Sequence, residues 1–343
     1  MKNAVLVVNA DKNINVGDYI QGLASSQFFD NVDLYLEREK LSFYDGDECR
    51  IIMNGWFMHN PNNWPPAPNI TPMFVAFHIN STSKEVMLNE SSVDYLKRHQ
   101  PIGCRDYDTM NMLNEVGVDA YFSGCMTLTL GEKYRSEECD GGVYFVDVCN
   151  DIKLSAFRVF KLLVYMLFNV CAIKGLWSKN LYVNSGKLRR VLYLAAFYKA
   201  YRGVFNRSTL LKAEYITQII KKQPNVVYDD RELMVVAQDL VQKYAKASLV
   251  VTSRIHCALP SLGLETPVVY VDDVNQDEES WCRLKGIKDL FNVVRWSGKS
   301  GGRLECDDAQ LRAKLLAGDA VENRSTWKKY RDLLVAKCSI GEF

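Results

Sequence analysis

The chain has 343 residues, 48% hydrophobic and 24% charged, with a formal net charge of +1 at pH 7. This composition is typical of a globular protein with one large or two medium domains, and the near-neutral charge gives no electrostatic reason to expect nucleic-acid binding. The apolar run after Lys2 has only the length of a strand, so we expect no signal peptide and a cytoplasmic location. The ten cysteines show no metal-ligand spacing, and we expect buried free thiols, no metal and no cofactor.

The first part of the chain alternates strand and helix signals. Predicted strands cover residues 5–9, 32–36, 51–54, 74–79, 102–105 and 120–122, and predicted helices cover residues 19–29, 91–98 and a segment ending at Gly117. Asp18 is the predicted N-cap of the first helix, and Asp106 or Asp108 that of the last. This alternation predicts a doubly wound α/β fold.

The sequence Cys139-Asp140-Gly141-Gly142 is the best candidate for a domain boundary. It predicts an N-terminal domain over residues 1–140 and a C-terminal domain over residues 141–343. The second part repeats the alternation, with strands predicted at 143–148, 249–252 and 268–271 and helices at 232–246 and 330–337.

Residues 152–213 differ from the rest because they contain no Asp or Glu but twelve Lys or Arg, interleaved with aromatic residues. Two helices with a basic side suit peripheral contact with the inner membrane surface or docking of an anionic lipid. Arg158 and Lys161 interrupt the apolar run, which disfavours a transmembrane helix. The alternative is a core helix packed under a second one, with its basic face turned to solvent or substrate.

The segment from Val250 to Val271 is the most informative. It is predicted to be a buried strand, a polar turn, a helix and a second buried strand. The turn places Arg254 and His256 at the start of the helix, where unpaired N–H groups favour anions. An arginine binds carboxylate or phosphate, and a histidine transfers protons near neutral pH. The segment therefore predicts a site for a small anionic substrate, formed by Ser253, Arg254, Ile255 and His256, although an arginine in such a turn can also cap a neighbouring helix.

Four stretches, in order along the chain, resemble the polysaccharide pyruvyl transferase family. They are Asn15-Val16-Gly17-Asp18, Pro101-Ile102-Gly103-Cys104-Arg105-Asp106, Ser123-Gly124-Cys125-Met126-Thr127-Leu128-Thr129-Leu130, and Val251-Thr252-Ser253-Arg254-Ile255-His256-Cys257-Ala258-Leu259-Pro260 with Thr266-Pro267-Val268-Val269. Asn54-Gly55-Trp56 also fits. The resemblance implies an α/β fold of two Rossmann-like domains facing a cleft, as in GT-B glycosyltransferases. It further implies phosphoenolpyruvate as donor, a sugar as acceptor, and a pyruvate ketal with released phosphate as products.

The implied chemistry gives each candidate residue a role. Arg254 would bind the donor phosphate or carboxylate, and His256 would donate a proton or neutralise the phosphate. Asp18 or Asp106 would contact the acceptor hydroxyls, one of them as base, although both fit simple helix capping equally well. Acceptor-side candidates also include Asn15, Gly17 and Arg105, of which Arg105 could instead form an interdomain ion pair. No motif places a further donor-site arginine in residues 152–213.

Two other functions share this architecture. One is a GT-B-like glycosyltransferase that uses a nucleotide sugar, and the other is a non-catalytic protein that binds or assembles glycans. The sequence leaves open whether the acceptor is a free glycan, a nucleotide sugar or a lipid-linked oligosaccharide.

Overall fold

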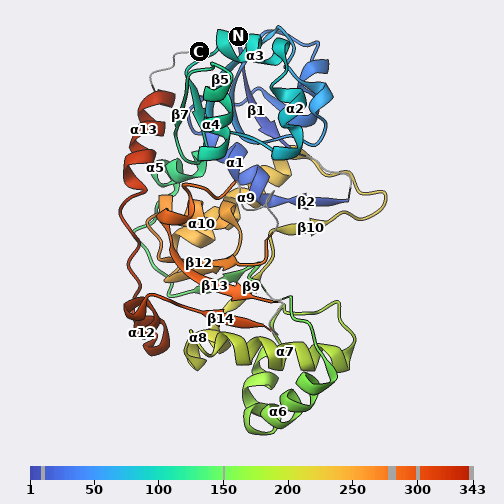
Figure 1. The fold of residues 1–343 in the computed structure, drawn as a ribbon, viewed down its shortest axis with the longest axis vertical. Helices are drawn as coiled ribbons and strands as arrows, with labels where there is room; N and C mark the ends of the chain where they lie inside the picture. Colours follow the sequence, from blue (N-terminus) through green and yellow to red (C-terminus); the bar gives the residue numbers. More distant parts are fainter. Residues whose placement is uncertain (9–11, 150, 277–282, 299–301, 340–343) are drawn as a thin grey trace.

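The computed structural model describes residues 1–8, 12–149, 151–276, 283–298 and 302–339, and contains two six-stranded sheets (Figure 1). The first sheet has the order β3-β1-β4-β5-β6-β7, all parallel, from β3 (Leu34–Glu37), β1 (Lys2–Val7), β4 (Cys49–Phe57), β5 (Ile70–Ile79), β6 (Ile102–Cys104) and β7 (Ala120–Phe122). The second has the order β14-β13-β12-β11-β8-β9, from β14 (Arg303–Glu305), β13 (Asn292–Ser297), β12 (Val268–Asp273), β11 (Leu249–Thr252), β8 (Val143–Val146) and β9 (Glu214–Ile216). Only β13 and β14 are antiparallel in it.

The helices are distributed over both parts of the chain. The α-helices are α1 (Val16–Ser26), α2 (Lys84–Met87), α3 (Glu90–Arg98), α4 (Tyr107–Glu115), α5 (Gly131–Tyr134), α6 (Ala156–Trp177), α7 (Lys187–Tyr201), α8 (Arg207–Lys212), α9 (Asp230–Ala245), α10 (Ile255–Gly263), α12 (Ala309–Ala317) and α13 (Lys328–Ser339). Short 3-10 helices are η1 (Arg38–Phe43), η2 (Pro61–Asn63), η3 (Ser81–Ser83), η4 (Met126–Leu130) and η5 (Lys288–Leu290). The predicted α/β class is confirmed. The two-domain arrangement around a cleft, with a boundary near residue 140, stays a prediction.

Central parallel strands are buried on both faces, which explains their uninterrupted apolar runs. Val250 and Val251 of β11 are fully buried, as are Val268 and Val269 of β12. The strand predicted at 5–9 begins earlier, at Lys2, and its predicted end at Asn9 lies outside the described residues. The strand predicted at 74–79 begins four residues earlier, at Ile70.

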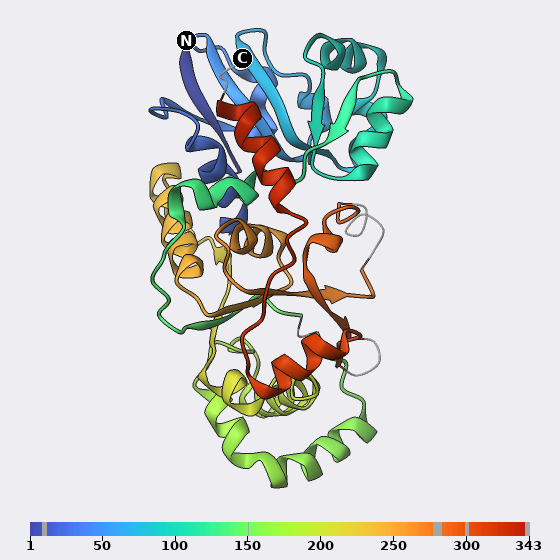
Figure 2. The same ribbon diagram turned by 90° about the vertical axis from the view of Figure 1, so that its left-hand side faces the viewer.

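One hydrophobic core joins the two parts of the chain. Helix α1 packs against α9 and α10, and the buried cluster between them includes Tyr19 and Leu23 from α1 with Ala237 and Ala258 from the other two helices. Two strands from different parts of the chain, β2 (Asn13–Asn15) and β10 (Ile219–Lys221), also pair antiparallel. Figure 2 shows α13 returning from the second sheet to run beside the first. The start of α1 is thereby fixed next to the second sheet.

The first helix begins earlier than predicted, because Asn15 rather than Asp18 caps it. The Asn15 side chain accepts a hydrogen bond from the backbone N–H of Gly17 at 3.2 Å, and the helix starts at Val16. Asp18 lies in the first turn, where its carboxylate accepts hydrogen bonds from the side chains of Asn15 (3.2 Å) and Gln21 (3.1 Å). Both residues are good capping types, so the sequence alone does not separate them.

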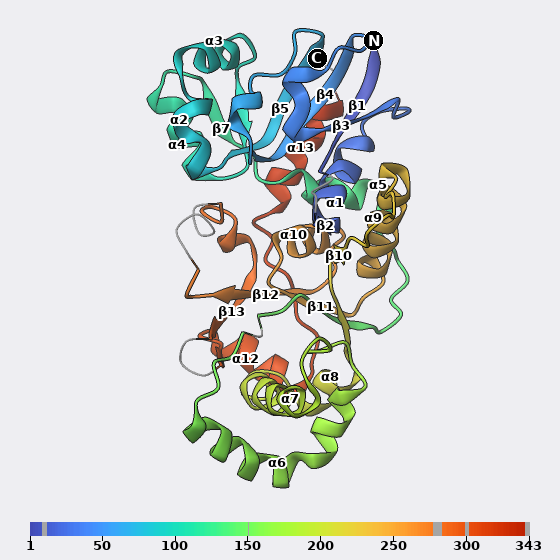
Figure 3. The same ribbon diagram turned by 90° about the vertical axis from the view of Figure 1, so that its right-hand side faces the viewer.

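The acid-free segment forms α6, α7 and α8 at the end of the molecule opposite the first sheet (Figures 1 and 3). Helix α6 packs on α7 and is buried only at Leu162, Ala172, Ile173 and Leu176. By length and composition alone α6 could cross a membrane, although Arg158 and Lys161 led the sequence analysis to disfavour a span. Buried core helices of soluble proteins often meet the same two criteria. Helix α6 differs from them because most of it is exposed.

Candidate active site

A cavity of about 640 Å³ lies between the two parts of the chain. Its lining includes most of the predicted site residues: Asn15, Asp18, Arg105, Ser253, Arg254, Ile255 and His256. Several lining residues come at or just after the carboxyl ends of strands, with Arg105 after β6, Asp147 after β8, Ser253 after β11 and Asp273 at the end of β12. This is where open parallel sheets bind ligands.

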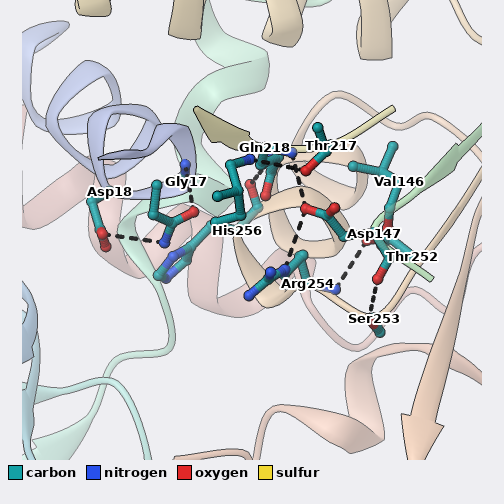
Figure 4. Close-up of polar contacts among 12 residues, drawn as sticks. Gly17, Asp18, Val146, Asp147, Thr217, Gln218, Thr252, Ser253, Arg254 and His256 are labelled. Carbon is teal, nitrogen blue, oxygen red and sulfur yellow. Dashed lines mark hydrogen bonds and ion pairs between the residues drawn. The ribbon is translucent and has the colours of Figure 1, made fainter. Parts of the chain in front are cut away.

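The turn from β11 into α10 is fixed to the neighbouring strand β8. The Thr252 hydroxyl donates to the Val146 carbonyl at 2.8 Å and accepts from the Arg254 N–H at 3.0 Å. The Ser253 hydroxyl donates to the Asp147 carbonyl, and Arg254 Nε forms an ion pair with Asp147 Oδ2 at 3.4 Å (Figure 4). The Arg254 side chain, 43% exposed at the cavity, is therefore held in place by Asp147 without being buried.

Gln218, just before β10, connects the two predicted motif turns. Its N–H donates to Asp147 Oδ2 at 2.9 Å, and its carbonyl accepts from the Val16 N–H at 2.8 Å. Its side-chain amide donates to the His256 carbonyl at 3.2 Å (Figure 4). Gln218, which was not predicted from the sequence, thus links the start of α1 to the start of α10.

His256 is only 8% exposed, and its Nε2 is buried with no partner among the described residues. Its backbone departs from helical geometry at φ −83° and ψ 19°. Gly17 lies directly behind it, since a Cβ built on Gly17 would be 3.0 Å from His256 Cβ. Burial lowers the pKa of His256 well below its ordinary value, and the charges of Arg105, Arg283, Arg254 and Arg38 lower it further. These shifts favour the neutral form of His256 at neutral pH when no anion is bound.

Arg105 is the least expected member of the site. It is 1% exposed, it lines the cavity, and none of its three guanidinium nitrogens has a hydrogen-bond partner within the described chain. Burial lowers the pKa of this guanidinium, while the neighbouring Asp106 opposes that shift. An unpaired buried cation is costly in free energy unless an anion neutralises it. The interdomain ion pair that the sequence left open for Arg105 is not formed within the described residues.

Asp106 does not line the cavity. Its carboxylate caps α4 by accepting from the Thr109 N–H at 2.9 Å, and it is 2.5 Å from His78 Nδ1. Burial raises the pKa of Asp106, but His78, Arg105 and the Thr109 N–H outweigh burial and hold the pKa below its ordinary value. The geometry therefore favours the capping role among those predicted, with Asp106 positioned behind Arg105 rather than facing a substrate.

Asp18, in contrast, faces the cavity. Burial raises the pKa of Asp18 above its ordinary value, although Arg38 and the hydrogen bond from Asn15 counteract this shift. A carboxylate with a raised pKa is better matched to taking a proton near neutral pH. Asp18 therefore combines a place in the cavity lining with a raised pKa, which suits the predicted role of a general base.

Two further arginines, Arg38 and Arg283, line the same cavity and were not identified from sequence. Arg38 is 2.9 Å from Glu39 and stacks over the Trp56 ring at 5.1 Å. Arg283 Nε is buried without a partner among the described residues. They are the nearest counterpart of the donor-site arginine that no motif placed, and neither lies in residues 152–213. No sequence signal distinguishes them from surface arginines.

The fold and the cavity define the class: an α/β protein with an arginine-lined cavity at the carboxyl ends of parallel strands. Within the described part of the chain, no cluster of three His, Cys, Asp or Glu side chains could hold a metal ion. The family model described as polysaccharide pyruvyl transferase matches residues 15–273.

The chain therefore belongs to the polysaccharide pyruvyl transferase family, which confirms the resemblance found in the motifs. The family identifies the protein as a transferase with a polysaccharide acceptor. Searches of curated proteins and of solved structures found no match to the chain.

Proposed function

We propose that this transferase moves pyruvate from phosphoenolpyruvate onto a sugar of a cell-surface polysaccharide precursor, forming a ketal and releasing phosphate. The observation that carries the donor assignment is Arg105, a buried cation without a partner in the cavity that also contains His256. Phosphoenolpyruvate combines a carboxylate and a phosphate on a three-carbon frame, so it can supply the anionic partner that Arg105 does not have among the described residues.

Arginines on opposite sides of the cavity suit the two ends of the donor. Arg105 follows β6 of the first sheet, and Arg254 follows β11 of the second. Their planar guanidinium groups bind carboxylate and phosphate in bidentate fashion. The N-terminus of α10, which begins at Ile255, adds backbone donors and a partial positive charge. We therefore assign Arg105 to the donor side of the site, whereas the sequence analysis has it among the acceptor-side candidates.

The reaction requires three proton movements. The methylene carbon of the donor gains a proton, which makes its neighbouring carbon electrophilic, and a sugar hydroxyl adds there as it loses its own proton. Loss of phosphate and addition of a second hydroxyl close the ketal, and the proton of that second hydroxyl leaves with the phosphate. We assign the first proton to His256 and the deprotonation of the attacking hydroxyl to Asp18.

His256 acquires that proton because of the donor. Without a bound anion, burial and then the charges of the four arginines lower the pKa of His256 and keep it neutral. A bound phosphate and carboxylate offset the arginine charges, so the pKa of His256 rises and the imidazole takes up a proton. Binding of the donor thus protonates the histidine that acts as the acid, and this step uses no cofactor.

We place the protein in the cytoplasm, where phosphoenolpyruvate is available. All nine cysteines that the structure describes are free, and Cys49, Cys104, Cys125, Cys257 and Cys338 are buried, as a reducing compartment allows. Cys139 and Cys171 are exposed, contrary to the expectation of buried thiols. The acceptor is a sugar, either free or in a lipid-linked oligosaccharide.

The test compares phosphoenolpyruvate with nucleotide sugars by calorimetric titration and by thermal shift, since a ligand that binds the native state raises the melting temperature. We expect binding of phosphoenolpyruvate to wild type and to the matched surface variant Arg98→Met, and no binding to Arg105→Met. Binding of a nucleotide sugar instead would identify a glycosyltransferase. Binding of neither would favour a non-catalytic glycan-binding protein and overturn the donor assignment.

A further inference from the structure

Helix α6 exposes a row of large apolar side chains that no other part of the described chain covers. Phe160, Leu167 and Phe168 are 66%, 74% and 84% exposed, and Phe157 and Val164 are also exposed. Their spacing of three, four and seven residues places them along one side of the helix. A kink at Asn169 divides α6, and Leu162 before the kink and Ala172, Ile173 and Leu176 after it are buried in a cluster shared with α7. The exposed row is therefore not an unfinished part of the core.

Basic side chains border this row. Lys161 Nζ lies 4.3 Å from the centre of the Phe157 ring, so its ammonium group is held at the edge of the apolar row. Beside it a second cavity, of about 870 Å³, lies between α6, α7, β14 and α12. Six basic side chains and two carboxylates line that cavity: Arg158, Lys161, Lys199, Arg295, Arg303, Arg312, Glu305 and Asp307.

Both carboxylates are already neutralised. Asp307 pairs with Arg295 at 2.6 Å and Glu305 pairs with Arg303 at 2.8 Å. The remaining four cations, Arg158, Lys161, Lys199 and Arg312, form no ion pair within the ranges that the structure describes. The cavity therefore carries a net positive charge next to an exposed apolar helix.

We propose that α6 lies in the plane of an anionic lipid bilayer, with Phe160, Leu167 and Phe168 at the acyl boundary and the adjacent basic cavity on lipid phosphates. An interfacial helix combines an apolar face with Lys and Arg at its edges, and anionic lipids attract those cations. The donor cavity is a separate one, since its lining residues come partly from the first part of the chain and none of them lines the cavity beside α6. The proposal does not depend on which donor that cavity binds.

The charge of this region favours an anionic bilayer surface over two alternatives, a second copy of the chain and a membrane-spanning position of α6. A second copy of the chain would bring two acid-free, basic segments together, and like charges disfavour that contact. A spanning helix would have to bury Arg158 and Lys161 near one end and leave α7. An anionic surface satisfies both the row and the cations without moving α6 from α7.

The first experiment is co-sedimentation of the full chain with large vesicles of phosphatidylcholine, with or without one quarter phosphatidylglycerol. We expect at least about tenfold stronger binding to the anionic vesicles, because each nearby Lys or Arg strengthens binding several-fold. Sodium chloride at 0.5 M should remove most of it. Absence of binding, or equal binding to both vesicle types, would overturn the proposal.

The second experiment removes the apolar row. The triple variant Phe160→Gln, Leu167→Gln, Phe168→Gln should bind anionic vesicles about a hundredfold more weakly. The matched control Phe43→Gln, Val227→Gln changes two equally exposed apolar residues elsewhere and should bind like wild type. An unchanged melting temperature shows that each variant is folded. Wild-type vesicle binding by the triple variant contradicts the proposed orientation.

The third experiment separates the remaining occupants. Cys171 on α6 and Cys139 outside it are both exposed, so each can carry an environment-sensitive fluorophore after the other is changed to serine. Vesicles should shift the emission at Cys171 and leave Cys139 unchanged. Protein that resists extraction by salt and alkaline carbonate would show a spanning helix instead. A dimer without vesicle binding, made monomeric by the triple variant, would show a second copy instead.

Discussion

Arginines line one cavity of the described structure and arginines with lysines line another, and the two cavities differ in how deeply their most buried cation is withdrawn from water. In the cavity between the two parts of the chain, Arg105 is 1% exposed and His256 is 8% exposed. Beside α6, the cations border solvent and a row of exposed apolar side chains. We infer that cationic side chains suit different kinds of ligand in the two cavities, and that burial is the property that separates them.

Burial strengthens electrostatic interactions and restricts what can enter. A charge in a poorly solvated cavity interacts strongly over a short distance, and salt screens it little. Such a site selects a small anion of matching shape. Exposed cations interact weakly one by one but attract any extended anionic surface. The comparison predicts that the two regions respond differently to mutation, salt and pH.

The largest effect should come from the acid and the base. His256→Ala and Asp18→Asn should each lower pyruvate transfer about 10²–10⁴-fold, because each removes a proton-transfer group. Release of phosphate from phosphoenolpyruvate in the presence of acceptor measures it. Asp94→Asn, an exposed change on α3, is the control and should leave the rate unchanged. Near-normal rates in both site variants would remove these residues from the mechanism.

The next largest effect should be a difference in salt dependence between ligand binding at the two cavities. Between 50 mM and 500 mM sodium chloride we expect vesicle binding to fall about tenfold or more, and donor binding to fall less than about fivefold. Co-sedimentation and calorimetric titration on the same protein preparation measure the two. If donor binding proves as salt-sensitive as vesicle binding, the buried arginines do not form its main contacts.

How much of this could be read from the sequence depends on how local each feature is. The β11-turn-α10 segment was predicted because buried strands, a polar turn and Arg254 with His256 are adjacent along the chain. Asn15 and Asp18 are equally good caps three residues apart, so only the folded backbone chooses between them. Local patterns thus identified the turns but not which polar atom faces the cavity.

The cavity residues that were not predicted from the sequence are those that only the tertiary structure brings to the cavity. Gln218 reaches the site through the pairing of β10 with β2, and Arg38 and Arg283 come from segments without any motif. The unpaired state of Arg105 is equally invisible in sequence, since it depends on every neighbour. In α6 the residue types predicted a basic amphipathic helix, but only the packing of α7 shows which side is exposed.

A smaller effect concerns pH. Burial and four arginines hold the pKa of His256 well below its ordinary value, and the charge of a bound donor should raise it. Donor binding then takes up a proton, so affinity should increase as pH falls through the pKa of the bound state, by at most about tenfold per unit for one proton. Below the pKa of the free state the gain should level off.

Titration calorimetry in buffers of different ionisation enthalpy counts that proton. His256→Gln should lose the uptake, while the titration of the donor's own phosphate remains in both proteins. The difference between them therefore isolates the histidine. Equal proton uptake by wild type and His256→Gln would show that another group responds, with Asp18, whose pKa burial raises, as the next candidate.

The smallest expected effect is on the stability of the protein without a ligand. It compares the loss of a buried cation with the loss of an exposed one. Arg105→Met removes a buried cation that has no partner in the described chain, so it should raise the free energy of unfolding by about 1–2 kcal/mol in phosphate-free buffer. Lys161→Gln removes an exposed cation beside α6 and should change it by less than about 0.5 kcal/mol. Urea unfolding monitored by fluorescence measures both. A loss of stability in Arg105→Met would mean that Asp106 and its surroundings already compensate the guanidinium, which would then be part of the structure rather than a charge kept for an anion.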